Sequence, residues 1–332
     1  MSSRSRALPR ELARRLLARE RDAVPEALNL ADDRRPERRA AALALLDVLE
    51  RESPFPGAPR VGITGAPGAG KSTLLDALVR ALRADDETVA IVAIDPSSQT
   101  SGGALLGDRI RVRAGSGDPG VFIRSMAARD RLGGISDAAW AGIAILAAVF
   151  DRVFVETVGV GQSESDVVPL VDTLVYVANP GSGDELQYMK AGLLEFPDVF
   201  VVSKADLGAS ADRTAAELES ARGLAERAPE AWLAPVLRVS GRDGTGTPQL
   251  LAALTAHRAY ILANGSLALR RRAGALAHVV AGLRRRYGSH GLEQIGGVRG
   301  VGERLDREPG RSSFAWLDAL SREIEDALRK PS

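Results

Sequence analysis

A glycine-rich stretch near residue 65 restricts most strongly what this chain can fold into. Residues 61–73 read VGITGAPGAGKST. The spacing G-x-x-x-x-G-K-[ST] is supplied by Gly65, Gly70, Lys71 and Ser72. An apolar run, Arg60–Thr64, precedes the loop, and leucines at helical spacing follow it in Ser72–Arg83. A strand, a glycine-rich loop and a helix in this order predict a loop whose backbone N–H groups surround phosphate oxygens. We expect Lys71 to reach the β- and γ-phosphates and the Ser72 hydroxyl to bind Mg²⁺.

The flanking sequence extends this unit into an α/β fold. Apolar segments alternate with helical ones between residues 60 and 262. The expected strands are Arg60–Thr64, Thr88–Ile94, Val121–Ser125, Arg152–Glu156, Thr173–Ala178, Asp198–Ser203 and Pro235–Val239. Such a pattern predicts a P-loop NTPase with a mostly parallel sheet covered by helices on both faces. Charged helical segments flank it, which predicts three domains: an N-terminal helical extension (1–57), the nucleotide-binding domain (58–263) and a C-terminal helical arm (264–332).

Acidic residues follow two of the expected strands. Ligands of parallel sheets bind outside the carboxyl ends of the strands, so residues at these positions are candidates for ligand binding. Asp95 opens the run DPSSQTSGGALLGD and Asp108 closes it, while Glu156 follows RVFV. Carboxylates beside a phosphate loop typically bind Mg²⁺ or its water shell, and the glycines between Asp95 and Asp108 suit a segment that orders around a γ-phosphate. The alternative for Asp95 and Asp108 is an ordinary loop with two solvated aspartates.

Two further segments predict contacts to the nucleotide. In NPGSGDELQYMK (Asn179–Lys190), Asp184 and Lys190 lie close together at the start of a helix, and Lys190 is a candidate to respond to the γ-phosphate. In Ser203-Lys204-Ala205-Asp206, Asp206 is placed to accept two hydrogen bonds from the guanine edge, with Lys204 along the base plane. Ser240 and Gly241 would supply a backbone N–H to the guanine oxygen.

The composition excludes several other chemistries. The chain has no cysteine and three histidines, the first at residue 257, so thiolate sites are excluded and a histidine base is absent from the first 256 residues. The net charge of +1 gives no argument for binding nucleic acid or an anionic membrane. The N-terminus lacks the apolar region of an export signal, and residues 138–150 are too few to span a bilayer. These features predict a cytoplasmic protein.

The motifs together resemble one known family. GAPGAGKST, DPSSQTSGGALLGDRIR, FIRSMAARDRLGG, ETVGVGQSE, PGSGDELQ and SKAD occur in the order of the MeaB/ArgK family of P-loop GTPases. By position, its nucleotide-binding loop falls on Gly65, Ala66, Pro67, Gly68, Ala69, Gly70, Lys71, Ser72 and Thr73. Its magnesium-linked carboxylates fall on Asp95, Asp108 and Glu156, and a mobile third switch on Pro180–Lys190. Two departures are Ser203, where the family usually has Asn, and Asp130 and Arg131, where it usually has Gly and His.

The resemblance also implies a role. It implies a homodimeric GTPase that acts as a chaperone for an adenosylcobalamin-dependent acyl-CoA mutase, typically methylmalonyl-CoA mutase. GTP and Mg²⁺ are the implied ligands. The C-terminal arm, which looks too small to bury its apolar face alone, independently favours a dimer built from residues 264–332.

Three alternatives stay open. A kinase or ATPase of the same fold would act on a small acceptor, and a nucleotide-dependent scaffold would hydrolyse almost nothing. A GTPase that delivers nickel would need clustered Cys and His residues, which this chain lacks.

Overall fold

The computed structural model describes residues 3–33, 35–54, 56–96, 117–128, 136–157, 167–181, 195–223, 231–308 and 310–329. The chain divides into two compact units. The sheet unit comprises Ala58–Ile135 and Phe150–Leu267, and the helical unit comprises Met1–Gly57, Ser136–Val149 and Ala268–Ser332. The helical unit therefore combines both ends of the chain with a segment from its middle. The domain boundaries predicted at residues 57 and 263 stay predictions.

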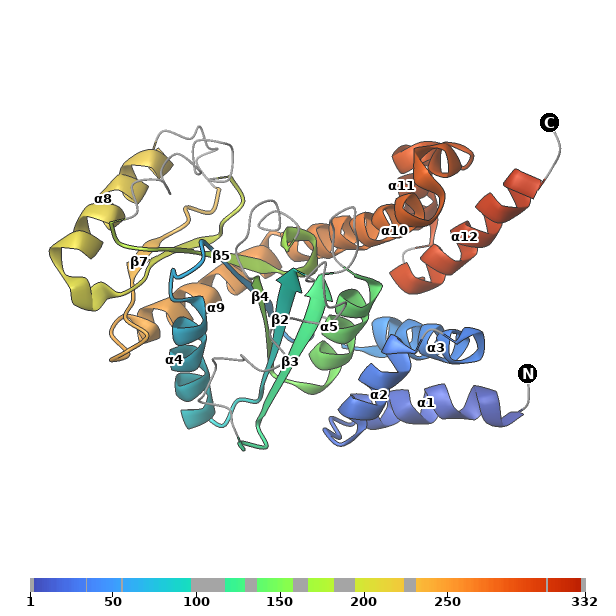
Figure 1. The fold of residues 1–332 in the computed structure, drawn as a ribbon, viewed down its shortest axis with the longest axis horizontal. Helices are drawn as coiled ribbons and strands as arrows, with labels where there is room; N and C mark the ends of the chain where they lie inside the picture. Colours follow the sequence, from blue (N-terminus) through green and yellow to red (C-terminus); the bar gives the residue numbers. More distant parts are fainter. Residues whose placement is uncertain are drawn as a thin grey trace. The chain divides into compact units, whose positions relative to one another are not determined.

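The described residues of the sheet unit form one seven-stranded sheet in the order β3-β2-β4-β1-β5-β6-β7, with every pair parallel (Figure 1). The strands are β1 Arg60–Thr64, β2 Val89–Pro96, β3 Val121–Ala128, β4 Arg152–Thr157, β5 Thr173–Ala178, β6 Val199–Val202 and β7 Val236–Arg238. The predicted α/β class with a parallel sheet is confirmed. Because β1 lies between β4 and β5, the segments that follow these three strands meet at one edge of the sheet.

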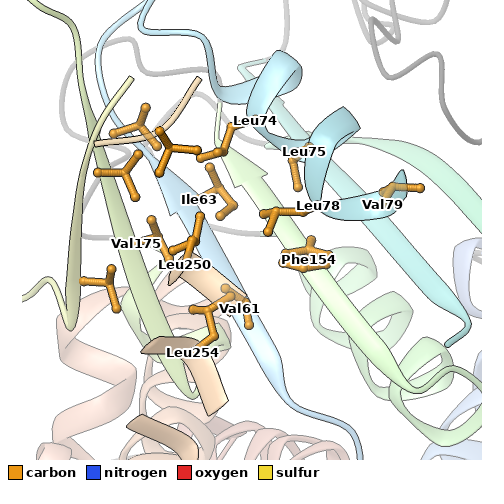
Figure 2. Close-up of a cluster of buried hydrophobic side chains, with 14 of the residues drawn as sticks. Val61, Ile63, Leu74, Leu75, Leu78, Val79, Phe154, Val175, Leu250 and Leu254 are labelled. Carbon is orange, nitrogen blue, oxygen red and sulfur yellow. The ribbon is translucent and has the colours of Figure 1, made fainter. Parts of the chain in front are cut away.

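Alternate residues of the strands pack against helices on opposite faces. The described parts of this unit contain the helices α4 (Lys71–Ala84), α8 (Ala209–Gly223) and α9 (Thr247–Ala263), with the 3₁₀ helices η1 (Val168–Leu170) and η3 (Ala205–Leu207). On one face, side chains of α4 and α9 contact Ile63, Phe154 and Val175 (Figure 2). On the other, α8 covers Tyr176 and Phe200. Every residue of β5 and β6 is buried, which explains why these strands are mainly apolar rather than alternating.

In the described residues of the helical unit there are seven helices, and the first two residues of one of them, α10, belong to the sheet unit. The seven helices are α1 (Ser3–Leu17), α2 (Ala23–Asp32), α3 (Pro36–Glu52), α5 (Asp137–Val149), α10 (Ser266–Glu293), α11 (Gly297–Arg307) and α12 (Ser313–Arg329). The sequence predicted helical extensions but did not locate α2 or α11 within them. Pro25 lies in the first turn of α2, where its missing N–H costs nothing. In α11, Gly296 and Gly297 have positive φ at the start, and the turns after them bury Val301 and Leu305.

The C-terminal helices bury their apolar faces against one another. The shared core contains Val279, Val280, Leu283, Leu292, Ile295, Val301, Leu305, Trp316, Leu317, Leu320 and Ile324. The arm also packs against helices from other parts of the chain, since His278 of α10 stacks on Trp140 of α5 and Ser313 of α12 donates a hydrogen bond to Glu50 of α3. The expectation that the arm is too small to bury its apolar face alone stays a prediction. Within the ranges described, no helix has both the length and the apolar character that crossing a bilayer requires.

The helical unit contains a buried histidine, His278. The His278 ring stacks on Trp140 at 4.9 Å between ring centroids and meets the edge of Phe314 at 4.7 Å. Burial lowers the pKa of His278 to about 4, and the nearby Arg285 and Arg286 also lower it, while the Asp137 carboxylate opposes them. At neutral pH this histidine is therefore uncharged.

We expect the helical unit to lose stability as the pH falls from 7 to 4. The unfolded histidine, with a pKa of about 6.5, takes up a proton that the folded protein excludes, so stability present above about pH 6.5 is lost towards pH 4, by about 3 kcal/mol. Urea unfolding of the parent and of His278→Gln between pH 4 and 7.5 measures how the free energy of unfolding changes with pH in each protein. Because glutamine does not titrate, the variant should show the shallower slope. Parallel pH profiles for the two proteins would contradict the assignment.

Candidate nucleotide-binding site

The phosphate-binding loop lies between the end of β1 and the start of α4. Gly65 has φ of 141°, and a Cβ atom at this position would lie 2.2 Å from the carbonyl oxygen of Val177 in β5. Only glycine fits there, because the neighbouring strand backbone cannot move away. Gly70 also has a positive φ and precedes α4 directly, so the unpaired N–H groups of the first helical turn follow the loop.

Lys71 places a positive charge inside this loop. Its side chain is buried, and its Nζ donates hydrogen bonds to the carbonyl oxygens of Gly65, at 2.7 Å, and Ala66, at 2.9 Å. A buried ammonium group is costly unless it is hydrogen-bonded, so these two contacts hold the charge in place. The loop therefore combines backbone N–H groups with a fixed cation, which is the chemistry that binds phosphate.

The side chains of Ser72 and Glu156 meet beside the loop. Ser72 Oγ donates a hydrogen bond to Glu156 Oε1 at 2.8 Å, although the two residues are 84 positions apart. The register of β1 and β4 pairs Ile63 with Glu156, which carries the carboxylate to the start of α4. Next to it, Thr157 Oγ1 donates to Thr64 Oγ1 at 3.0 Å and ties the ends of the two strands together.

This pair of side chains fits a magnesium ion. Hydroxyl and carboxylate oxygens are the ligands Mg²⁺ takes, and it keeps several waters, so it needs few protein ligands. Among the residues that the structure describes, no group of three or more His, Cys, Asp or Glu side chains could hold a metal. The oxygen atoms of Ser72 and Glu156 are of the ligand type that suits Mg²⁺.

Several predicted site residues lie outside the described part of the chain. These are Asp108, Asp184 and Lys190, together with the departures Asp130 and Arg131. Asp95 lies in β2 opposite Ala127, but its side chain is also outside the description. Their roles stay predictions.

The segment predicted to recognise the base follows β6. Ser203 is buried, and its hydroxyl donates to the carbonyl oxygen of Ala178 at 3.1 Å. Asp206 is exposed in η3, where its carboxylate is accessible to a ligand. The N–H of Ala205 donates to the carbonyl oxygen of Val239 at 3.2 Å, which joins this segment to the residues after β7.

The second predicted base segment packs against the phosphate side of the site. Ser240 is fully buried. A Cβ atom on Gly241 would lie 2.6 Å from the carbonyl oxygen of Thr73, so only glycine allows this segment to approach α4 so closely. The structure thus brings residues 203–206, 240–241 and 65–73 together at the carboxyl edge of the sheet.

With this geometry in place, comparison with known proteins identifies the family. The model described as "Methylmalonyl Co-A mutase-associated GTPase MeaB" matches residues 24–287. The chain belongs to this family. A putative GTPase of Pyrococcus horikoshii is 45% identical over 266 residues, covering 79% of this chain and 81% of the relative. The mitochondrial methylmalonic aciduria type A homolog of Mus musculus is 37% identical over 267 residues, covering 77% of this chain and 64% of the relative.

A solved structure extends the similarity to nearly the whole MeaB-family chain. It is described as an LAO/AO transport system kinase, and it superimposes with a TM-score of 0.68 at 26% identity, covering 98% of this chain and 99% of the other. The MeaB/ArgK resemblance drawn from the motifs is therefore confirmed, and so is the P-loop NTPase fold.

One residue of the MeaB-family site was not singled out from the sequence. Asn179 directly follows β5, and its Oδ1 accepts a hydrogen bond from Lys204 Nζ at 2.6 Å. The same Nζ donates to the carbonyl oxygen of Gly68 at 3.1 Å. The only sequence indication was the position of Asn179 at a strand end, because its partner lies 25 residues away.

Proposed function

We propose that this MeaB-family protein is a Mg²⁺-dependent GTPase that acts in the cytoplasm as a switch for an adenosylcobalamin-dependent acyl-CoA mutase. The observation that carries the proposal is the convergence of Lys71, Ser72 and Glu156 beside the phosphate-binding loop. Membership of a family described as mutase-associated GTPases supports the choice of nucleotide and of partner.

The chemistry is attack of water on the γ-phosphate of GTP, for which the protein supplies mainly positioning and charge. Backbone N–H groups of residues 65–73 bind the phosphates, and Lys71 neutralises charge that develops on them. Ser72 and Glu156, with Asp95 and Asp108, would hold Mg²⁺, which when bound supplies further positive charge at the phosphate oxygens.

Further roles are proposed for the attacking water, the γ-phosphate and the base. Glu156 is also the candidate for orienting the attacking water, since its carboxylate lies next to Ser72 at the edge of the phosphate loop. Asp184 and Lys190 are the candidates for sensing the γ-phosphate. The base would be held by Asp206, Lys204 and the 240–241 segment.

The partner assignment rests on the family description and on the relative named for methylmalonic aciduria type A. Methylmalonyl-CoA mutase is the proposed partner, and GTP binding and hydrolysis would gate loading of its cofactor. The test is phosphate release from GTP by the purified protein, with and without a mutase, together with co-sedimentation of the two proteins. Free phosphate release that changes when the mutase is added is the expected result.

The same assay separates the alternatives. Transfer of phosphate to a small acceptor without release of free phosphate would favour the kinase. This alternative is kept because the similar solved structure is described as a kinase. Tight GTP binding without hydrolysis would favour a scaffold. A homodimer is also proposed, on the family resemblance and on the exposed apolar side chains Leu269, Val298 and Leu328 of the arm, and sedimentation velocity of the full chain tests it.

We expect Asp206→Asn to change the preferred base from guanine to xanthine. The aspartate accepts two hydrogen bonds from guanine, whereas the asparagine amide donates where xanthine has an acceptor. Competition of GTP, XTP and ATP for the parent and the variant measures the preference. Glu217→Gln, which neutralises an exposed carboxylate on α8, is the matched control and should keep the preference for guanine. A variant with unchanged base preference would remove Asp206 from base recognition.

A further inference from the structure

Lys204 is held in a backbone conformation that a lysine rarely adopts. Its φ of 51° and ψ of 46° lie in the left-handed region, which costs a residue with a Cβ atom free energy. Such a conformation persists only where surrounding contacts fix it. Here backbone hydrogen bonds fix it, from the Ala205 N–H to the Val239 carbonyl oxygen at 3.2 Å and from the Leu207 N–H to the Lys204 carbonyl oxygen at 2.9 Å. The side chain that this backbone directs is held by hydrogen bonds from Nζ to Asn179 Oδ1, at 2.6 Å, and to the carbonyl oxygen of Gly68, at 3.1 Å.

These bonds form a bridge between three segments of the site. Gly68 belongs to the phosphate loop, Lys204 to the base segment, and Asn179 follows β5 immediately. Ser203 does not make this bridge with its side chain, because its hydroxyl donates to the Ala178 carbonyl, and a Cβ atom on Gly70 would still lie 3.7 Å from Ser203 Oγ. Lys204 thus joins the base segment directly to the phosphate loop.

Asn179 is well placed to orient the lysine. Ala178, the residue before it, pairs with Val202 in the parallel ladder, and the N–H of Ser203 donates to the Ala178 carbonyl at 3.0 Å. The backbone on both sides of the contact is therefore fixed by the sheet. A short hydrogen bond from an ammonium group to an amide oxygen is also stronger than one between neutral groups.

We infer that Asn179 is a positioning residue for nucleotide binding, which acts by holding Lys204 against the phosphate loop so that the base segment and the loop present a single surface to a guanine nucleotide. The inference rests on the GTP site proposed above. Asn179 need not touch the nucleotide, since its effect passes through the lysine.

The test is a double-mutant cycle on the full-length protein, with GDP and GTP affinities measured by isothermal titration calorimetry. Asn179→Ala should weaken both nucleotides by about tenfold, because the lysine loses the hydrogen bond that orients it. Asn179→Asp, whose carboxylate accepts the same bond, should stay within about threefold of the parent. In a Lys204→Ala background, Asn179→Ala should cost less than about twofold, since the residue then has nothing to position.

Two further variants separate this effect from general damage. Asn264→Ala removes an asparagine whose Oδ1 accepts the Ser266 N–H at 2.9 Å in the turn after α9, and it should bind as the parent does. Asn179→Ser is the substitute if Asn179→Ala melts early. Its side chain is polar but too short to reach the lysine, so it should weaken nucleotide binding by the same factor as alanine.

Parent-like affinity in Asn179→Ala and Asn179→Ser would overturn the inference, and so would an equal loss with and without Lys204, which indicates a merely structural role. A parent protein that binds no guanine nucleotide would instead refute the proposed function itself.

Discussion

Lys71→Ala should lower GTP turnover by at least about 100-fold, because it removes the cation that lies within the phosphate loop. The parent Nζ is fixed by the carbonyl oxygens of Gly65 and Ala66. Alanine cannot supply the positive charge at the β- and γ-phosphates. Single-turnover hydrolysis of radiolabelled GTP measures the loss, with circular dichroism to establish that the fold is kept.

A control variant distinguishes lost chemistry from lost stability. Arg83, near the end of α4, donates hydrogen bonds to Asp118 Oδ2 at 2.9 Å and to the carbonyl oxygen of Glu87 at 2.8 Å, away from the loop. Arg83→Ala should lower the melting temperature but keep turnover close to that of the parent. If Lys71→Ala hydrolysed GTP at the parent rate with an unchanged spectrum, the phosphate site would be wrongly assigned.

Glu156→Gln should slow hydrolysis by about 100-fold or more while nucleotide affinity stays within about tenfold. The carboxylate accepts the Ser72 hydroxyl hydrogen bond at 2.8 Å, and glutamine can still accept that bond through its carbonyl oxygen. The variant therefore keeps the contact but loses the negative charge. Because Glu156 lies next to the phosphate loop rather than the base segment, the loss should fall on kcat.

Glu87→Gln is the matched control for this charge. Glu87 also contacts β4, but at its first residue, where it accepts hydrogen bonds from Arg152. Neutralising it should change stability slightly and leave turnover unchanged. Stopped-flow measurements compare the rates of phosphate release by the parent, Glu156→Gln and Glu87→Gln. Equal rates for Glu156→Gln and the parent would exclude Glu156 from the mechanism.

The architecture of the sheet unit could be predicted because its signals are local. The strands at Arg60–Thr64 and Thr173–Ala178 have the predicted bounds, and α4 starts one residue before its predicted first residue. The two strands are marked by short runs of apolar residues, and the start of α4 is marked by the glycines that precede it. In one segment the local pattern was a poor guide, because glycines disfavour a helix. Burial of Val301 and Leu305 in the core of the arm stabilises α11 there despite its glycines.

The sequence alone determined the phosphate-binding loop, because a strand, a spaced glycine loop and a helix lie within about two dozen consecutive residues and need no distant partner. It also determined the family, because six motifs occur in the family's order between residues 65 and 206. Only the tertiary structure decided which distant residues meet. Strand order places Val177 against Gly65, Glu156 against Ser72, and Asn179 against Lys204. It also assigns α5 to the helical unit with both chain ends. These pairings depend on register and packing between segments far apart in the chain, and no local pattern encodes them.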